Sequence, residues 1–217
     1  LILLESVNGK PIPERPKNEF QPAPGTPANE IPEAARKDLL FQDSFEGSTH
    51  GVNAVPEHYF KYDVNGYQGK SLFLNDYESA WLLPQKFSDI GEELTLDFYY
   101  QAPRPFKPDN GILWDIIRGS LSEKHFFWLY FEPKSGKICF AAGYRQTNGN
   151  IDWKIREFSE NSSWPENIWM RMKLNIGKKG IRLMVNGKSQ IDAARPVDIK
   201  FLENLQIGRR FVSAGKS

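Results

Sequence analysis

The stretch that decides the fold is residues 164–187, WPENIWMRMKLNIGKKGIRLMVNG. Apolar and polar residues alternate in it over nine positions, and a period of two is typical of a β-strand with one buried face rather than of a helix. A glycine-flanked turn follows, and a second alternating run ends at Asn186-Gly187, a pair that tolerates positive φ and favours tight turns. The inward positions expected for the two strands are Ile168, Met170, Met172, Leu174 and Ile176, then Ile181, Leu183 and Val185. The stretch therefore predicts an antiparallel hairpin in an all-β domain.

The composition supports one folded domain and argues against two classes of partner. Of the 217 residues, 40% are hydrophobic and 13% are aromatic, which is ample material for a core. The 28 basic and 27 acidic residues leave a net charge of +1, so there is no electrostatic reason to expect nucleic acid or an anionic membrane surface. The one cysteine, Cys139, excludes an intrachain disulfide and a cysteine metal site.

The first 37 residues differ in composition from the rest. Seven of the fifteen prolines fall between Pro11 and Pro32, and alternating proline and polar residues favour extended conformations without a hydrogen-bond ladder. We therefore expect residues 1–37 to form an extended, Pro-rich arm, held either by its own domain or by a neighbouring chain in an assembly. Residues 38–212 then form the folded domain, and residues 213–217 form a C-terminal tail.

The beginning of the chain bears on its location. A chain that starts with Leu is expected to be processed or trimmed, and the apolar stretch 1–4 is too short to span a bilayer. It fits the stub of a removed signal peptide or anchor as well as a few residues that dock on a surface. We expect an exported protein, in a bacterial periplasm or at a cell surface, with a cytosolic location left open by the single cysteine.

Short apolar runs, separated by turn signals, continue on both sides of the hairpin. Residues 69–74 and 79–83 are expected to pair, and residues 126–131 are apolar on both faces, as in a central strand covered by layers. Further strands are expected at residues 39–45, 94–100, 112–117, 137–142, 152–158 and 204–207. Roughly ten to twelve strands must close or double over to hide their edges. The predicted fold class is an antiparallel two-sheet jelly-roll sandwich.

The order of motifs resembles the laminin-G-like branch of the concanavalin A-like lectin/glucanase superfamily. The motifs are Asp43-Ser-Phe45, Gly69-Lys-Ser-Leu-Phe-Leu74, the strand that carries Trp169, the turn Val185-Asn-Gly187 and the closing strand Leu205-Gln-Ile-Gly208. The resemblance covers roughly residues 39–210 and implies the same jelly-roll sandwich. The superfamily includes lectins, adhesion modules, surface subunits, glycosidases and polysaccharide lyases, so the resemblance does not fix the function.

Signals for catalysis are weak in this sequence. A retaining glycosidase needs two carboxylates about 5 Å apart, but Asp76-Tyr-Glu78 lies in an expected turn, and Glu93 and Asp97 are about 13 Å apart on a strand. Residues 142–146, Ala-Gly-Tyr-Arg-Gln, resemble one strand of alginate lyases, but the companion arginine-rich and Gln-Ile-His strands are absent. We therefore expect a noncatalytic protein, with a degenerate polysaccharide lyase or hydrolase as the third interpretation.

Candidate ligand-binding residues lie in or beside the expected loops at strand ends. Sugars are bound by exposed aromatic rings that stack on their CH faces and by amide, carboxylate or guanidinium groups that bond their hydroxyls. The candidates are Trp153, Tyr144, Arg145, Asp109 and Asn110. Laminin-G-like modules often bind calcium through loop Asp and Asn, and the resemblance implies Asp109 or Asp76 for that role, although no spaced acidic cluster supports it.

These observations favour a noncatalytic structural or adhesive subunit of an exported or surface assembly, with residues 1–37 docking on a neighbouring chain by strand addition or polyproline contacts. The alternative is a carbohydrate-binding, lectin-like module. The expected partners are accordingly other protein chains or a glycan, with no nucleic acid and no membrane span in this chain.

Overall fold

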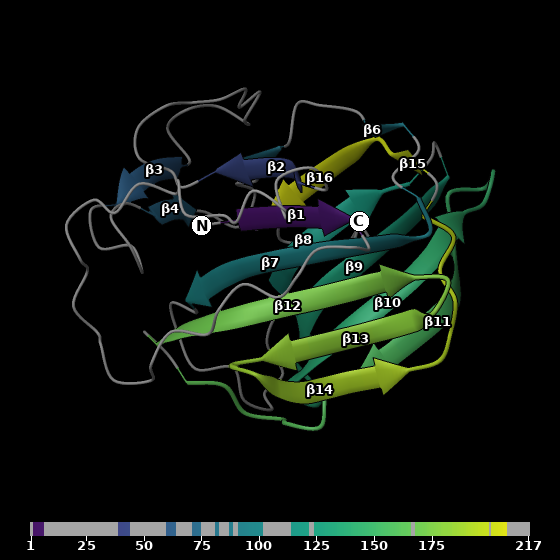
Figure 1. Ribbon diagram of the computed structural model, residues 1–217. Coiled ribbons are helices and arrows are strands. Elements are labelled where there is room, and N and C mark those ends of the chain that lie inside the picture. The colour runs from purple at the N-terminus through teal and green to yellow at the C-terminus, as the bar shows by residue number, and fades with distance from the viewer. Residues whose placement is uncertain are drawn as a thin grey trace, which may run out of the picture.

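The chain folds as β-strands joined by turns and loops. The computed structural model describes residues 91–101, 114–121, 124–165, 168–199 and 201–207 and, before them, the segments 2–6, 39–43, 60–63, 71–74, 81–82 and 87–88; these contain no helix (Figure 1). The strands are β1 (Ile2–Ser6), β2 (Leu39–Asp43), β3 (Phe60–Asp63), β4 (Ser71–Leu74), β5 (Trp81–Leu82), β6 (Phe87–Ser88), β7 (Glu93–Gln101), β8 (Trp114–Ser120), β9 (His125–Glu132), β10 (Lys137–Arg145), β11 (Ile151–Phe158), β12 (Trp169–Gly177), β13 (Gly180–Val185), β14 (Lys188–Ala193), β15 (Phe201–Leu202) and β16 (Asn204–Ile207).

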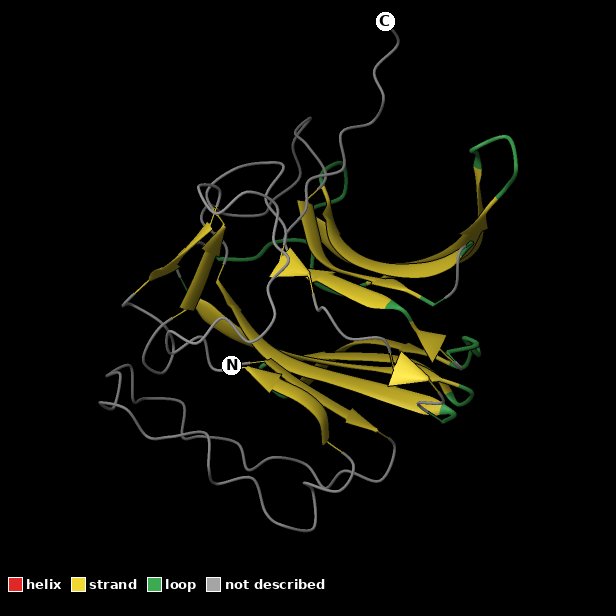
Figure 2. Ribbon diagram, turned by 90° about the horizontal axis from the view of Figure 1, so that it is seen from above, coloured by secondary structure: helices red, strands yellow, loops and turns green. Residues whose placement is uncertain are grey.

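Most of these strands belong to two six-stranded antiparallel sheets. The first sheet has the order β14-β13-β12-β7-β1-β2, and the second has the order β11-β10-β9-β8-β16-β5. Figure 2 shows the two sheets stacked as layers, and the long strands of the second sheet are bent so that its outer face, turned away from the first sheet, is concave. The predicted fold class, an all-β, antiparallel two-sheet jelly-roll sandwich, is confirmed.

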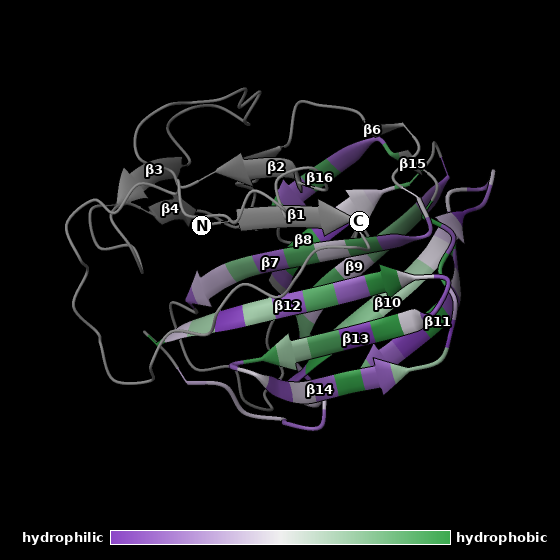
Figure 3. Cartoon of the chain, viewed as in Figure 1, coloured by the Kyte–Doolittle hydropathy of each residue, from purple (hydrophilic) through white to green (hydrophobic). Residues whose placement is uncertain are grey.

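The core lies between the two sheets and is built from alternate residues of each strand. Figure 3 shows this alternation as hydrophobic and hydrophilic bands along β12 and β13. The first sheet contributes Leu94, Leu96, Phe98, Met170, Met172, Leu174, Ile176, Ile181 and Leu183, and the second contributes Phe127, Leu129, Phe131, Ile138 and Phe140; each is at most 3% exposed. Removal of this apolar area from water is the main force that holds the sheets together.

The hairpin predicted from residues 164–187 is confirmed. Strands β12 and β13 pair with Leu174 opposite Leu183, and the turn after β13 has positive φ at Asn186 (50°) and Gly187 (75°), as this turn type requires. The prediction was wrong for Ile168, which precedes the strand and is 43% exposed. Strand β14 after the turn was not predicted, because its sequence KSQIDA has a single large apolar residue.

The N-terminal segment β1 lies inside the chain's own first sheet. It pairs on one side with β7 and on the other with β2, so that Leu4 is opposite both Leu96 and Phe41. The structure thus places residues 2–6 of the expected arm in the sandwich, whereas residues 7–38 and 208–217 lie outside the described residues. The predicted pairing of residues 69–74 with 79–83 was wrong, because β4 pairs with β3 and β5 pairs with β16.

Candidate functional site: the concave face of the second sheet

The concave face of the second sheet carries a row of aromatic and arginine side chains. Successive residues of a strand point to opposite faces, and along β10 Ile138, Phe140 and Ala142 belong to the core between the sheets. The outward residues of β10 are therefore Cys139, Ala141, Gly143 and Arg145. Their register partners on the same face are Tyr130, Trp128 and Phe126 of β9 and Phe158, Arg156, Trp153 and Ile151 of β11.

The aromatic rings of β9 and β11 meet above β10. Two strands that flank a third are about 9–10 Å apart, yet the ring centroids of Trp128 and Trp153 are 5.1 Å apart, and those of Phe126 and Trp153 are 5.7 Å apart. Both contacts are edge-to-face, the geometry that aromatic quadrupoles favour. The contacts are formed because β10 presents only small residues here, and Ala141 is covered completely.

A β-bulge sets the position of Trp153. The register of β10 with β11 shifts between Ala142 and Gly143. Lys154 is therefore the extra residue of the bulge, with no residue of β10 opposite it, and Trp153 stands opposite Gly143. A Cβ atom at Gly143 would lie 2.5 Å from the carbonyl oxygen of Asp152, which is closer than real contacts allow. Position 143 therefore requires glycine for steric reasons, and it lies opposite Trp153, whose side chain points to the concave face.

Two guanidinium groups are built into this face. The Arg118 guanidinium carbon lies 4.0 Å from the centroid of the Trp128 ring, a cation–π distance. The Arg156 Nη2 donates a hydrogen bond of 3.2 Å to the Tyr130 hydroxyl, and its guanidinium carbon lies 5.4 Å from the Phe158 ring centroid. Burial, and secondarily the neighbouring Cys139, raises the pKa of Tyr130, so the phenol is neutral at physiological pH and presents its oxygen to Arg156.

The exposed part of the face lies along β11. Trp128 and Tyr130 are each only 2% exposed, whereas Trp153 and Phe126 are half-buried and Phe158 is 41% exposed. The accessible surface here is therefore that of Trp153 and its surroundings, while Trp128 and Tyr130 pack beneath it. Such support from packed neighbours holds a contact side chain in one rotamer.

The structure brings some of the predicted ligand residues together and separates others. Trp153 lies near the start of β11, within the strand expected at residues 152–158, and it shares the concave face with Arg145. Tyr144 points to the opposite face, where its ring centroid is 5.9 Å from that of His125 and 5.1 Å from Lys154 Nζ. Asp109 and Asn110, and also Asp76 and Glu78, lie outside the described residues.

The surroundings of Tyr144 bear on the lyase interpretation. Asp152 forms an ion pair of 2.9 Å with Lys154, and hydrogen bonds from Lys154 and then Tyr144 lower the pKa of this carboxyl. Tyr144 and His125 thus lie on the face opposite to Arg145. These three side chains therefore do not converge in one cleft.

The sequence interpretation did not include Arg118, Trp128, Tyr130 and Arg156 among the ligand-binding residues. The apolar run 126–131 indicated a central strand covered on both faces, and β9 is central in its sheet. The available signal was that its outward residues, Trp128 and Tyr130, carry polar atoms whereas its inward residues do not. The Trp128 ring contacts Arg118 and the Tyr130 hydroxyl contacts Arg156, within a second buried hydrophobic cluster that also contains Cys139 and Ala141.

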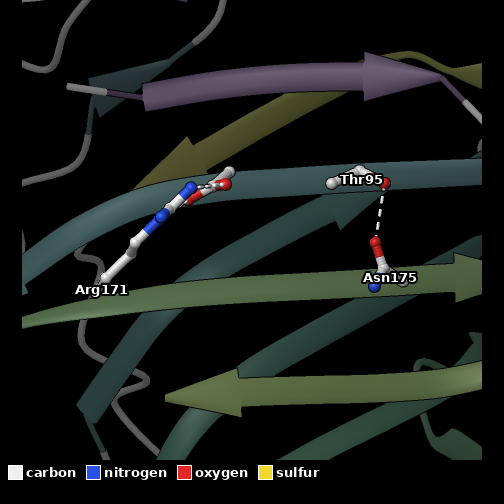
Figure 4. Close-up of polar contacts among 4 residues, drawn as sticks. Thr95, Arg171 and Asn175 are labelled. Carbon is white, nitrogen blue, oxygen red and sulfur yellow. Dashed lines mark hydrogen bonds and ion pairs between the residues drawn. The ribbon is translucent and has the colours of Figure 1, made fainter. Parts of the chain in front are cut away.

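The outer face of the first sheet is held by polar pairs (Figure 4). Arg171 donates to both carboxylate oxygens of Asp97, at 3.0 and 2.8 Å, and the Thr95 hydroxyl donates to the Asn175 amide oxygen at 2.7 Å. A groove of about 370 Å³ lies on this face, and Asp192 in its lining is paired with Arg182 at 3.0 Å. These pairs bind one another across neighbouring strands of the first sheet.

Within the described ranges, no three His, Cys, Asp or Glu side chains are grouped so as to hold a metal ion. Nor does any described segment form a helix that is long and apolar enough to cross a bilayer.

Comparison with known proteins gives only weak similarities. No family model matches the sequence, and no curated protein matches it. Among solved structures, the carbohydrate-binding module CBM66 from Bacillus subtilis is 14% identical, with 73% of this chain and 92% of that chain covered and a TM-score of 0.41. The metal-free carbohydrate recognition domain of Emp46p is 9% identical, with 73% and 79% covered and a TM-score of 0.39. At these values the similarity does not assign the chain to a family.

Proposed function

We propose that this chain is a noncatalytic carbohydrate-binding module of the laminin-G-like kind, and that its ligand lies on the concave face of the second sheet. The observation that carries the proposal is the half-buried Trp153, which packs edge-to-face on Trp128 and Phe126 and shares its face with Arg145 and Arg156. An aromatic face binds the apolar CH face of a sugar ring, and guanidinium groups bond its hydroxyl or acidic substituents.

The way Trp153 is held also suits a binding role. Its ring stands on a strand, is restrained by two neighbouring rings and projects from a concave surface, so little conformational freedom remains to be lost when a ligand binds. Concave surfaces with an aromatic lining and a few polar groups are typical small-ligand sites. An unrestrained tryptophan on a loop would lose more entropy for the same contact area.

The noncatalytic and exported character of the protein belongs to the same proposal. Of the two carboxylates considered for glycosidase chemistry on β7, Asp97 is bound by Arg171 on the face away from the second sheet.

An exported location, in a bacterial periplasm or at a cell surface, fits a protein that meets polysaccharides and stays a prediction. The structural or adhesive subunit role also stays a prediction, because most of the residues expected to dock on a neighbour, 1–37, lie outside the described residues.

Affinity electrophoresis in gels that contain soluble polysaccharides tests the proposal. We expect at least one polysaccharide to retard the protein, and the W153A variant to bind about tenfold more weakly or worse, since burial of an aromatic side chain contributes roughly 1.5–3 kcal/mol. The matched control is R182A, which removes an exposed side chain of the first sheet and should bind as the native chain does. Circular dichroism verifies that both variants fold. Retardation by no polysaccharide, or equal retardation of the W153A variant, contradicts the proposal.

A further inference from the structure

The charge distribution on the concave face is uneven. The outward positions of β8 to β11 hold four cationic residues, Arg118, Lys137, Arg145 and Arg156, but only two acidic ones, Asp115 and Glu132. Asp115 is 3% exposed, and the Glu132 carboxylate accepts hydrogen bonds from the Ser135 hydroxyl and amide at 2.7 and 2.8 Å. Asp115 is thus buried and Glu132 is held by Ser135, and the four cationic residues outnumber the two acidic ones at these positions.

Two of the cations flank the half-buried tryptophan. Trp153 is opposite Gly143 in the register; Arg145 lies two residues beyond Gly143 on β10, and Arg156 is opposite Ala141, two residues before it. Arg145 and Arg156 are both exposed. At the rise of a β-strand, their backbones are roughly 13 Å apart along the sheet, with the indole between them.

Arg145 and Arg156 differ from three other arginines of the structure in the groups that they contact. Arg171, Arg182 and Arg195 each meet a carboxylate at 2.8–3.0 Å. Arg156 instead bonds the neutral Tyr130 hydroxyl and lies near the Phe158 ring. Within the part of the chain that the structure describes, neither Arg145 nor Arg156 forms an ion pair with a carboxylate.

We infer that the ligand is an acidic glycan, whose carboxylate or sulfate groups are bound by Arg145 and Arg156 while one of its sugar rings stacks on Trp153. The inference rests on the proposed function and adds the chemical class of the ligand. A guanidinium binds a carboxylate or sulfate through two parallel charge-assisted hydrogen bonds, which are stronger than bonds to a neutral hydroxyl. Two such groups on one face therefore favour an anionic over a neutral polymer and make binding dependent on salt.

The test compares polymers that differ only in charge, by titration calorimetry at about 0.1 M salt. The probes are polygalacturonate and its carboxyl-reduced form, and chondroitin sulfate and its desulfated form, so that carboxylate and sulfate are distinguished. The variants are R145Q, R156Q and the double variant R145Q/R156Q, with R182Q as the control that removes the same charge from the other sheet. W153A is measured in parallel, and circular dichroism verifies folding.

We expect at least one acidic polymer to bind about tenfold more tightly than the form from which its carboxylate or sulfate groups have been removed. R145Q and R156Q should each weaken this binding severalfold, the double variant should bind with a smaller salt dependence, and R182Q should match the native chain. Equal affinity for neutral and acidic polymers, with W153A still impaired, overturns the inference and leaves the proposed function standing. Binding that R182Q weakens as much as R156Q does, or that W153A does not weaken, reveals unspecific ion exchange and overturns the inference as well. Absence of binding to any polysaccharide overturns both.

Discussion

The indole rings of Trp128 and Trp153 lie 5.1 Å apart between centroids, although their strands, β9 and β11, are separated by β10. The contact spans β10 because Ala141 and Gly143 leave the space above that strand free for larger neighbours. It joins a buried ring to a partly exposed one. The partly exposed Trp153 ring is thereby held in position on the concave face by the buried Trp128 ring.

Substitution of Gly143 should therefore disturb this arrangement. In G143A, the new Cβ would meet the Asp152 carbonyl oxygen at 2.5 Å, and the bulge that positions Trp153 must move. We expect a loss of about 1–3 kcal/mol in the free energy of unfolding, as is typical for an overpacked site. Urea denaturation measures it. A variant as stable as the native protein would show that the bulge relaxes freely and that glycine is not required there.

The ion pair on the other sheet provides a test of buried charge. Asp97 is 2% exposed and Arg171 is 16% exposed, so R171A leaves a carboxylate buried without its partner. We expect R171A to cost about 3 kcal/mol or more, and D97A to cost less because the arginine left behind reaches solvent. Chemical denaturation measures both.

The control for that pair lies in the same sheet. Arg182 and Asp192 form an exposed pair, with side chains 56% and 58% accessible, so R182A should cost about 0.5 kcal/mol or less. Comparable losses for R171A and R182A would show that the burial of Asp97 does not determine the stability of its pair.

Cys139 should be inert in the folded protein. Its side chain is buried completely beneath the aromatic layer, and burial raises the pKa of its thiol, so the reactive thiolate is scarce at pH 8. We expect no reaction with a disulfide reagent over minutes in the native state, and one reacting thiol per chain after unfolding in guanidinium. Rapid reaction of the native protein would mean that the aromatic layer opens readily.

Glu132 should contribute to stability in a pH-dependent way. Partial burial raises the pKa of Glu132, but hydrogen bonds from Ser135 and Lys134 outweigh this effect, and the net result is a lowered pKa. A group with a lowered pKa in the folded state stabilises the protein above its unfolded pKa, and this contribution is lost as pH falls through the folded value. The stability difference between the native protein and E132Q should therefore be present at pH 7 and shrink below about pH 4. A difference that is constant from pH 7 to pH 3 would contradict this assignment.

Regular alternation and turn chemistry made the hairpin of β12 and β13 predictable, because there each local preference agrees with the final structure. Strands β3 and β14 were missed, since they are short or mostly polar and are paired only in the folded sheet. The pairing of β4 with β5 was wrong for a related reason: neighbours in sequence were assumed to pair, whereas β5 pairs with the distant β16.

The candidate site was predictable in residue type but not in arrangement. Trp153 and Arg145 have the side chains that a sugar site needs, and the structure places them on one face. Tyr144, chosen on the same grounds, points away, because adjacent residues of a strand face opposite sides. Arg118 and Arg156 join the site only through cross-strand register and a bulge, and neither can be read from the sequence before the strands are paired.

The central claim is that glycans bind the concave face of the second sheet, and nuclear magnetic resonance of the isotope-labelled chain tests it most directly. On titration with the polysaccharide that binds best, we predict that the indole N–H signal of Trp153 and the signals of neighbouring residues on β10 and β11 shift, while those of Arg182 and its neighbours on β13 and β14 stay in place. Shifts confined to β13 and β14, or an unmoved Trp153 signal at saturating ligand, would contradict the account.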